Sequence, residues 1–221
     1  MKDGLNIMEG QGGRLSEEAI RLVGGVCTYA DSLLAFGNTV ASSYMRLVPH
    51  QEAPTRVFWS GLNRSALIRV PLAWSEVKDI AKQINPQESS QPGEFVKSKT
   101  VELRSGDGSA LIHLYLAGIT MAADWGFRHP ESLEIAEKLY VSGRTQPEDD
   151  VLDSFASLPA NCPESASLLK DKRELYEREG VFPSEVIDYI IQMLEKEDVG
   201  VRSYGRLENI LHIMHKDLHK H

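Results

Sequence analysis

The spacing of apolar residues predicts a long helix near the start of the chain. Apolar side chains recur three or four positions apart at Ile20, Val23, Cys27, Ala30 and Leu34, as on one face of an α-helix. Ser16 is a residue type that caps helix starts, and the two glutamates after it suit the positive end of a helix dipole. Gly37 and Asn38 are typical of a helix end. We therefore expect a helix of about twenty residues that buries one stripe.

The same kinds of pattern predict the other elements. Turn residues at Asp3-Gly4 and at Gln11-Gly12-Gly13 indicate an opening hairpin. Alternating apolar and polar residues predict a strand from Lys99 to Arg104, with Val101 and Leu103 on one face. Helical spacing predicts further helices over Ser75 to Ile84, Ser109 to Trp125, Glu164 to Glu179 and, capped by Ser184, up to about Lys196. Loops are expected over Asn85 to Gly93 and over much of His129 to Pro163.

The helix from Ser109 to Trp125 is apolar nearly all round, which is typical of a buried helix. Its apolar stretch is interrupted by polar side chains and falls short of the ~20 residues that span a membrane. The first residues lack the apolar run of a signal peptide. We therefore expect a cytoplasmic protein without a membrane partner.

Composition and charge narrow the class of protein. Of the 221 residues, 42% are hydrophobic and 25% are charged, as in ordinary folded domains. The net charge of −8 provides no general positive field for nucleic acid, so an anion would have to bind at a local cluster of arginines. Cys27 and Cys162 lack the spacing of a thiolate metal site or a disulfide scaffold, which fits a reducing compartment.

Positive charge gathers between Ser43 and Pro71, among apolar and turn-forming residues. This stretch carries four arginines and an isolated loop carboxylate, namely Arg46, Arg56, Arg64, Arg69 and Glu52. A guanidinium donates two parallel hydrogen bonds to a carboxylate or phosphate, and a loop glutamate can close over a bound substrate. Each of these residues taken singly also fits a surface charge.

Glu102 and Arg104 are two residues apart on the predicted strand, so both side chains project from one face. A carboxylate able to hold a divalent cation would then lie beside a guanidinium able to hold a phosphate, a pairing that phosphoryl transfer requires. The alternative is a solvated strand edge with a modest ion pair.

The histidines near the C-terminus offer a weaker candidate for a metal site. His212, His215 and His219 have helical spacing, but no carboxylate or thiolate of matching spacing accompanies them. This pattern favours a solvated helix face.

Several motifs of this chain are shared with one known family. They are Leu15 to Phe36, Arg46-Leu47-Val48-Pro49, Glu52-Ala53-Pro54, Asn63-Arg64-Ser65-Ala66, and Val101-Glu102-Leu103-Arg104 with Asp107. In order, spacing and flanking pattern they resemble the C-terminal part of the glutamine synthetase catalytic domain, over roughly residues 1 to 200. The Arg-Leu-Val-Pro and Asn-Arg-Ser-Ala motifs are the specific part of the signature.

The resemblance implies an ATP-dependent ligase that joins glutamate and ammonia through a γ-glutamyl phosphate, with Mg²⁺ or Mn²⁺. Carried over by position, it implies catalysis by Glu52 and Arg64, substrate binding by Arg46 and Arg104, binding of the ATP phosphates by Arg64 and Arg69, and metal ligation by Glu102. Glu52 would shield the acyl phosphate and help to deprotonate ammonium. Tyr140 stands where some bacterial members carry a tyrosine that is adenylylated.

The resemblance also implies a fold: α+β, a largely antiparallel sheet flanked by helices, of the guanido-kinase-like superfamily. We expect one partial domain over 1–221, in which 1–128 form the active-site wall and 129–221 are mainly helical. The family's N-terminal β-grasp domain and first catalytic strands have no counterpart here, and of the metal ligands only Glu102 remains. We therefore expect the isolated chain to lack ligase activity, and the full-length protein to form the family's double ring.

Departures from the family pattern leave two alternatives open. Leu62 replaces an arginine, Thr100 stands where an ATP-contacting arginine is common, and His50-Gln51 replaces a usual Gly-Tyr. The first alternative is a diverged ligase that joins glutamate to another amine. The second is a non-catalytic binding or regulatory module on the same scaffold.

Overall fold

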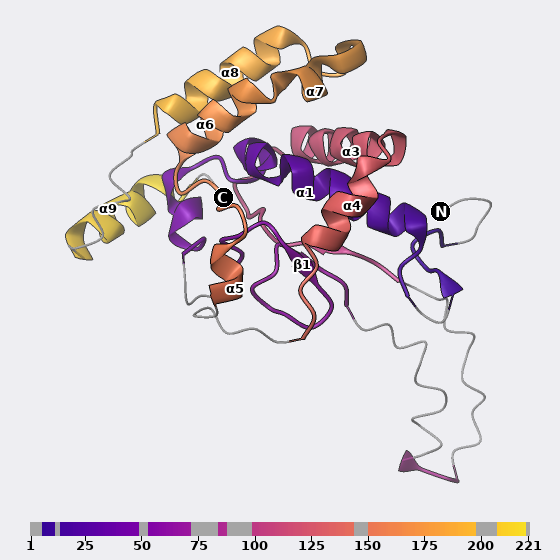
Figure 1. Ribbon diagram of the computed structural model, residues 1–221. Coiled ribbons are helices and arrows are strands. Elements are labelled where there is room, and N and C mark those ends of the chain that lie inside the picture. Colours follow the sequence, from indigo (N-terminus) through magenta and orange to yellow (C-terminus); the bar gives the residue numbers. More distant parts are fainter. Residues whose placement is uncertain are drawn as a thin grey trace.

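The computed structural model describes residues 6–11, 14–48, 53–71, 84–87, 99–143, 150–197 and 207–219. A central helix, α1, lies between a group of helices on one side and a small sheet on the other (Figure 1). The elements in chain order are α1 (Glu17–Gly37), η2 (Ala41–Met45), β1 (Trp59–Ser60), β2 (Ile68–Arg69), β3 (Glu102–Leu103), α3 (Ile112–Arg128), α4 (Glu131–Lys138), α5 (Asp150–Asp153), α6 (Cys162–Asp171), α7 (Arg173–Glu177), η4 (Arg178–Gly180), α8 (Ser184–Glu195) and α9 (Leu207–Asp217).

The predicted first helix is confirmed at both ends. The Ser16 side chain accepts a hydrogen bond from the Ala19 backbone N–H at 3.0 Å, and Asn38 caps the C-terminus by donating to the Leu34 carbonyl. By length and composition α1 resembles a membrane span, but its most apolar window is 67% buried within the protein, as in a core helix.

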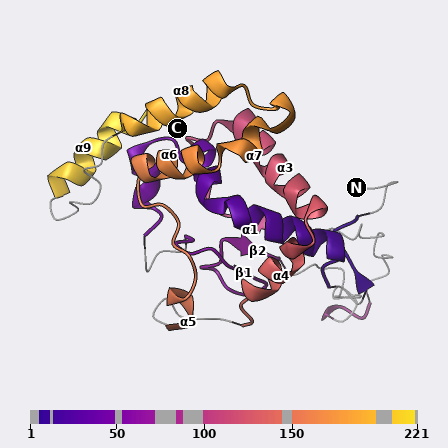
Figure 2. The ribbon, with the colours of Figure 1, turned by 45° about the horizontal axis from the view of Figure 1, so that its top comes forward.

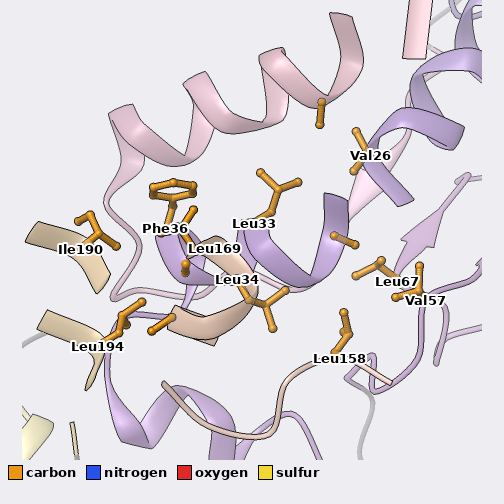
Figure 3. Packing of buried hydrophobic residues seen from close by; sticks show 14 of the residues in the cluster. Val26, Leu33, Leu34, Phe36, Val57, Leu67, Leu158, Leu169, Ile190 and Leu194 are labelled. Carbon is orange, nitrogen blue, oxygen red and sulfur yellow. The ribbon is translucent and has the colours of Figure 1, made fainter. Parts of the chain in front are cut away.

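The main hydrophobic core gathers around the C-terminal half of α1. Figure 3 shows Leu33, Leu34 and Phe36 packed with Leu169 of α6 and with Ile190 and Leu194 of α8. The ring of Phe36 lies 5.2 Å from that of Tyr176 and 5.4 Å from that of Phe182. Aromatic packing of this kind contributes beyond the area that it buries. This core therefore fixes the end of α1, from which the chain continues to η2.

Glycines bring α1 unusually close to its neighbours. A Cβ added at Gly25 would lie 2.2 Å from the carbonyl oxygen of Ala122 in α3, and one at Gly24 would lie 2.0 Å from that of Ser132 in α4. The contact is reciprocal, because a Cβ at Gly126 would lie 2.2 Å from the carbonyl oxygen of Arg21. Helix backbones thus touch directly where α1 crosses α3 and α4.

The two cysteines are both buried. Cys27 lies in α1 with 4% of its surface exposed, and Cys162 begins α6 with 1% exposed. No disulfide joins them, in line with their wide spacing in the sequence. Burial raises the pKa of the Cys27 thiol to about 12.

The sheet has the order β1-β2-β3, and Figure 2 shows β1 and β2 on the side of α1 away from α6 and α8. β1 and β2 pair in parallel, with Trp59 opposite Ile68. β2 and β3 pair antiparallel, with Arg69 opposite Glu102. The largely antiparallel sheet expected from the sequence is therefore not confirmed in the described residues, where one of the two pairings is parallel. The predicted strand over 99–104 is present as the shorter β3.

An antiparallel bridge between Glu9 and Leu15 is consistent with the predicted turn around residues 11–13. The backbone N–H of Gly10 donates to the Arg14 carbonyl at 2.9 Å, and that of Ser16 donates to the Met8 carbonyl at 3.1 Å. These bonds hold the segment before α1 against the start of the helix. The other turn signal, at Asp3-Gly4, lies outside the described residues.

The expectation that the helix from Ser109 to Trp125 is buried all round is wrong. α3 begins at Ile112 and ends at Arg128. Its small residues, including Gly118 and Ala122, face the core, whereas Ile112 is 64% exposed and Leu116 is 58% exposed. One side packs against α1, and the described residues leave the opposite, apolar side open.

Three further predictions about the second half of the chain need correction. The segment expected to be loop-rich contains α4. The single helix expected over Glu164 to Glu179 is divided at Lys172 into α6 and α7, and Asn161 caps α6 by accepting from the Glu164 N–H at 2.8 Å. Ser184 does not cap α8, because Pro183 occupies the cap position and Ser184 is the first helical residue.

Apolar spacing predicts that α8 buries Val186, Ile187, Ile190, Ile191 and Leu194; the last four are buried, whereas Val186 is half-buried. In the charged segment before it, Leu168, Leu169, Leu175 and Tyr176 are predicted to face inward; the last three are buried, whereas Leu168 is half-buried. The helix predicted over Ser75 to Ile84 and most of the loop after it fall outside the described residues. The division of the chain at residue 128 stays a prediction.

Asp124 provides a test of surface electrostatics, because it forms ion pairs with Arg128 at 2.9 Å and with Arg178. Burial alone raises the pKa of Asp124, but hydrogen bonds from the two arginines outweigh it and hold the pKa below its usual value. A lowered native pKa stabilises the fold above the unfolded-state value of about 3.9, and this contribution is lost as the pH falls through the native pKa.

We expect Asp124→Asn to lower the free energy of unfolding at pH 7 by about 0.5 kcal/mol. The difference from the wild type should vanish at acidic pH, where the native carboxylate is protonated. Urea unfolding between pH 2 and pH 7 measures it. A difference that does not change with pH would contradict the electrostatic account.

Candidate functional site

The sheet brings one carboxylate between two guanidinium groups. Arg69 and Glu102 are direct cross-strand partners on β2 and β3, and Arg69 Nη2 lies 2.8 Å from Glu102 Oε2. Arg104 Nε lies 3.7 Å from the other carboxylate oxygen, Oε1. Two positive charges against one negative charge leave a site with a net positive charge, suited to an anion. We call Arg69, Glu102 and Arg104 the sheet cluster.

The expectation that Glu102 and Arg104 share one face of the strand agrees with these distances, but the closer partner of Glu102 is Arg69 on the neighbouring strand. The alternative of a solvated ion pair does not describe Arg104, because its side chain is only 14% exposed. Glu102 is the more accessible member, with 43% of its side chain exposed.

Arg104 also ties the cluster to the loop between β1 and β2. Its Nη1 donates to the carbonyl of Arg64 and, at 3.2 Å, to that of Ala66. The loop itself is shaped by Asn63, whose side chain accepts from the Ser65 N–H at 2.8 Å, as in an Asx turn. The backbone of Arg64 is therefore fixed beside the sheet cluster, while its side chain is exposed.

Arg46 reaches the same region from η2. Its guanidinium donates to the carbonyl of Arg104 at 3.4 Å, to that of Ser105, and to that of Gly106 at 3.3 Å. These carbonyls belong to the turn that follows β3, which we call the carbonyl turn. The Nε atoms of Arg46 and Arg69 are buried and have no hydrogen-bond partner among the described residues. Buried unsatisfied donors are rare, and an acceptor that entered the site would relieve them.

A buried network of hydroxyl groups joins η2 to the segment after the carbonyl turn. Ser43 Oγ lies 3.0 Å from Ser109 Oγ, which donates to Asp107 Oδ1 at 2.7 Å. Thr39 uses both its N–H and its hydroxyl to bond Ser109, at 2.9 and 2.7 Å. The two segments that carry Arg46 and Arg104 are therefore held in a fixed relation.

Tyr115 of α3 packs against the carbonyl turn at Ser105 and Gly106. Its hydroxyl lies 3.1 Å from Ser105 Oγ, and a Cβ added at Gly106 would lie 2.7 Å from its ring. Burial raises the pKa of Tyr115, although the hydrogen bond with Ser105 acts in the opposite direction. Glycine at position 106 therefore leaves room for the Tyr115 ring to pack against the turn.

The remaining candidate residues either fall outside the described residues or form contacts away from this site. Glu52 lies outside the described residues. His212, His215 and His219 are exposed, which agrees with a solvated helix face. Tyr140 is 48% exposed, and its ring lies 4.6 Å from that of Trp59 at the edge of β1.

The described residues alone do not build a site for a divalent cation. No group of three or more His, Cys, Asp or Glu side chains lies together among them. Glu102 is the single carboxylate of the sheet cluster, and both of its oxygens face arginines. Divalent cations of this kind usually take several oxygen ligands, so further ligands would have to come from elsewhere.

An α+β fold with an arginine-rich cluster on its sheet defines the general class of this protein, and comparisons with known proteins narrow that class. The family model described as glutamine synthetase, catalytic domain, matches residues 1–204. The glutamine synthetase of Neisseria gonorrhoeae is 34% identical over 206 residues, which cover 91% of this chain and 38% of that protein. The glutamine synthetase of Pyrococcus horikoshii is 38% identical over 128 residues, which cover 58% of this chain and 24% of that protein.

Solved structures agree on the fold. The cryo-EM structure of Plasmodium falciparum glutamine synthetase gives a TM-score of 0.65 at 22% identity, over 95% of this chain and 44% of that one. The crystal structure of a novel glutamine synthase homolog also gives 0.65, at 20% identity, over 99% of this chain and 43% of that one. The chain belongs to the glutamine synthetase catalytic-domain family. It spans 38% of the length of its N. gonorrhoeae relative.

Proposed function

We propose that this chain is the C-terminal part of an ATP-dependent ligase that joins glutamate and ammonia through a γ-glutamyl phosphate. The observation that carries the proposal is the sheet cluster, in which Arg69 and Arg104 flank the half-exposed Glu102. Phosphoryl transfer depends on fixed positive charge around the transferred group. Family membership makes ATP and glutamate the first ligands to test.

Within this proposal each arginine has a distinct task. Arg64, exposed on its fixed loop, and Arg69 would neutralise the ATP phosphates. Arg104 and Arg46 would bind the carboxylates of glutamate, with Arg46 held in place by the carbonyl turn. The hydrogen bonds that orient Arg46 and Arg104 would reduce the reorganisation needed as charge develops.

Two acidic residues also belong to the proposed site. Glu52 would shield the acyl phosphate and assist deprotonation of ammonium. Glu102 would be the contribution of this chain to a Mg²⁺ or Mn²⁺ site, with the other ligands lying outside the described residues. We further propose that the full-length protein is cytoplasmic and assembles as a double ring, so that neighbouring subunits can complete each site.

Because the described residues provide one carboxylate at the site, we expect the purified 221-residue chain to form no γ-glutamyl hydroxamate from glutamate, hydroxylamine and Mg-ATP. A full-length N. gonorrhoeae enzyme in the same assay is the positive control. Turnover by the 221-residue chain that depends on ATP and Mg²⁺ would show that this chain holds a complete site.

Calorimetric titration separates the proposal from the two alternatives. Binding of Mg-ATP that is weakened by Arg69→Gln supports a ligase fragment that keeps its phosphate site. Nucleotide binding by this chain, together with a lack of turnover in longer, complemented forms, favours a non-catalytic module. Turnover of a longer form with another amine, but not with ammonia, favours the diverged ligase.

A further inference from the structure

We propose that Asp217, on the C-terminal helix α9, is a positioning residue for Arg46. This inference rests on the proposed function for the role of Arg46, but the contact itself does not. The backbone N–H of Ser42 donates to Asp217 Oδ2 at 3.0 Å. Ser42 lies in η2, which leads directly to Arg46. Figure 1 shows α9 at the edge of the molecule, beside this segment.

Burial sets Asp217 and Ile213 apart from the other described side chains at the C-terminal end of α9. Asp217 is fully buried and Ile213, one turn earlier, is 3% exposed. Leu211, Met214 and Leu218 are at least half exposed. Residues four apart lie on one face of a helix, so α9 meets η2 through Ile213 and Asp217. Aspartate is seldom fully buried unless it is paired, so this carboxylate fixes where α9 can sit.

Hydrogen bonds to Ser109 and Asn38 also hold η2. Ser43 Oγ lies 3.0 Å from Ser109 Oγ beyond the carbonyl turn, and the Tyr44 hydroxyl donates to the Asn38 carbonyl at 3.2 Å. The backbone N–H of Arg46 in turn donates to the Ser43 carbonyl at 3.4 Å. η2 is therefore clamped between α9 and the segment that follows β3. A shift at Ser42 would be passed through one helical turn to Arg46.

This contact joins Ser42, inside the residues that the family model matches, to Asp217, which lies beyond them. The catalytic-domain model ends at residue 204, whereas α9 spans Leu207–Asp217. Asp217 therefore adds to the site from a segment beyond the family model, although the glutamine synthase homolog aligns with 99% of this chain. Its role is to hold the backbone that presents Arg46, without contact with substrate.

Hydrogen exchange and the Arg46 side-chain signal test the proposal in the full 221-residue chain. In Asp217→Ala we expect exchange of the Ser42 amide to become about tenfold faster, because its acceptor is lost. The Arg46 Nε–H resonance, assigned by its loss in Arg46→Lys, should shift and exchange faster as well. Asp217→Asn retains an oxygen acceptor and should restore both readouts. His215→Ala, on the exposed side of the same helix, is the matched control and should change neither.

The proposal is overturned if the Arg46 resonance stays unchanged in Asp217→Ala, or if Asp217→Asn disturbs it as much as alanine does. If Asp217→Ala does not fold, Asp217→Glu, which displaces the carboxylate by one methylene, must move the Arg46 signal for the proposal to stand. A glutamate titration of the same samples tests the proposed function independently of the coupling between Asp217 and Arg46. Failure of the wild type to respond to glutamate counts against the proposed function and not against the coupling of Asp217 to Arg46.

Discussion

Gly25→Ala is expected to lower the free energy of unfolding by about 3 kcal/mol, by overpacking the crossing of α1 and α3. The added Cβ would lie 2.2 Å from the carbonyl oxygen of Ala122 and 2.8 Å from the backbone nitrogen of Gly126. Both are backbone atoms, so relief requires the helices to separate. Helix propensity alone favours alanine over glycine by roughly 1 kcal/mol, which makes a large loss diagnostic of the close approach.

Urea unfolding followed by circular dichroism measures this effect. Gly61→Ala is the control, because its added Cβ would lie 3.9 Å from its nearest neighbour, the carbonyl oxygen of Val70. We expect that variant to stay within about 1 kcal/mol of the wild type. If Gly25→Ala instead raises the free energy of unfolding, α1 and α3 can accommodate a Cβ at their crossing, which would contradict the predicted overpacking.

Glu102→Gln is expected to strengthen the binding of metal-free tripolyphosphate about tenfold, or 1.4 kcal/mol. In the wild type the carboxylate forms ion pairs with Arg69 at 2.8 Å and with Arg104 at 3.7 Å. Its removal leaves two guanidinium groups to act on the anion. With Mg²⁺ present, the wild type should gain more affinity for ATP than the variant does, because the variant has lost the single carboxylate of the sheet cluster.

Isothermal titration of the two proteins, with and without Mg²⁺, gives both comparisons. Glu134→Gln is the matched control, since Glu134 is an exposed carboxylate paired with Lys138 at 2.7 Å on α4. Arg69→Gln should weaken tripolyphosphate binding by a similar factor. If Glu102→Gln weakens the binding of the metal-free anion, the sheet cluster is not an anion site.

The elements that sequence predicts best are those specified by local signals. α1 has a capping serine, acidic residues in its first turn and a clear apolar stripe, and the structure confirms both ends. α8 shows the limit of such signals. Its buried stripe is confirmed except at Val186, but its N-terminus follows Pro183 and not a side-chain cap. Periodicity thus identifies the buried face more reliably than the first residue.

Predictions that depend on partners in space were less successful. The apolar character of α3 predicts burial all round, but burial requires a neighbour on each side, and among the described residues Ile112 and Leu116 remain exposed. The parallel pairing of β1 with β2 joins strands of two residues each. Strands this short carry no periodicity from which their direction could be inferred.

The site divides in a similar way between side chains and main chain. Spacing alone predicts that Glu102 and Arg104 share one face. The charge pattern singles out Arg46 and Arg69, and the family resemblance adds their roles. The carbonyl turn was missed because backbone carbonyls belong to every residue and leave no mark in a sequence. The one available signal was the run of small and turn-forming residues after Arg104, Ser105 to Ser109, which marks a tight turn but not the arginine that it binds.

The burial of both cysteines has a practical consequence for following α9 in solution. The Cys27 thiol, with its pKa raised to about 12 by burial, is almost entirely protonated at neutral pH, and Cys162 is shielded in the core. A thiolate is the form that reacts with maleimides and iodoacetamides. A cysteine introduced at the exposed position 215 would therefore be labelled selectively in the folded protein. A fluorophore attached there would report the docking of α9 without any need to remove the native thiols.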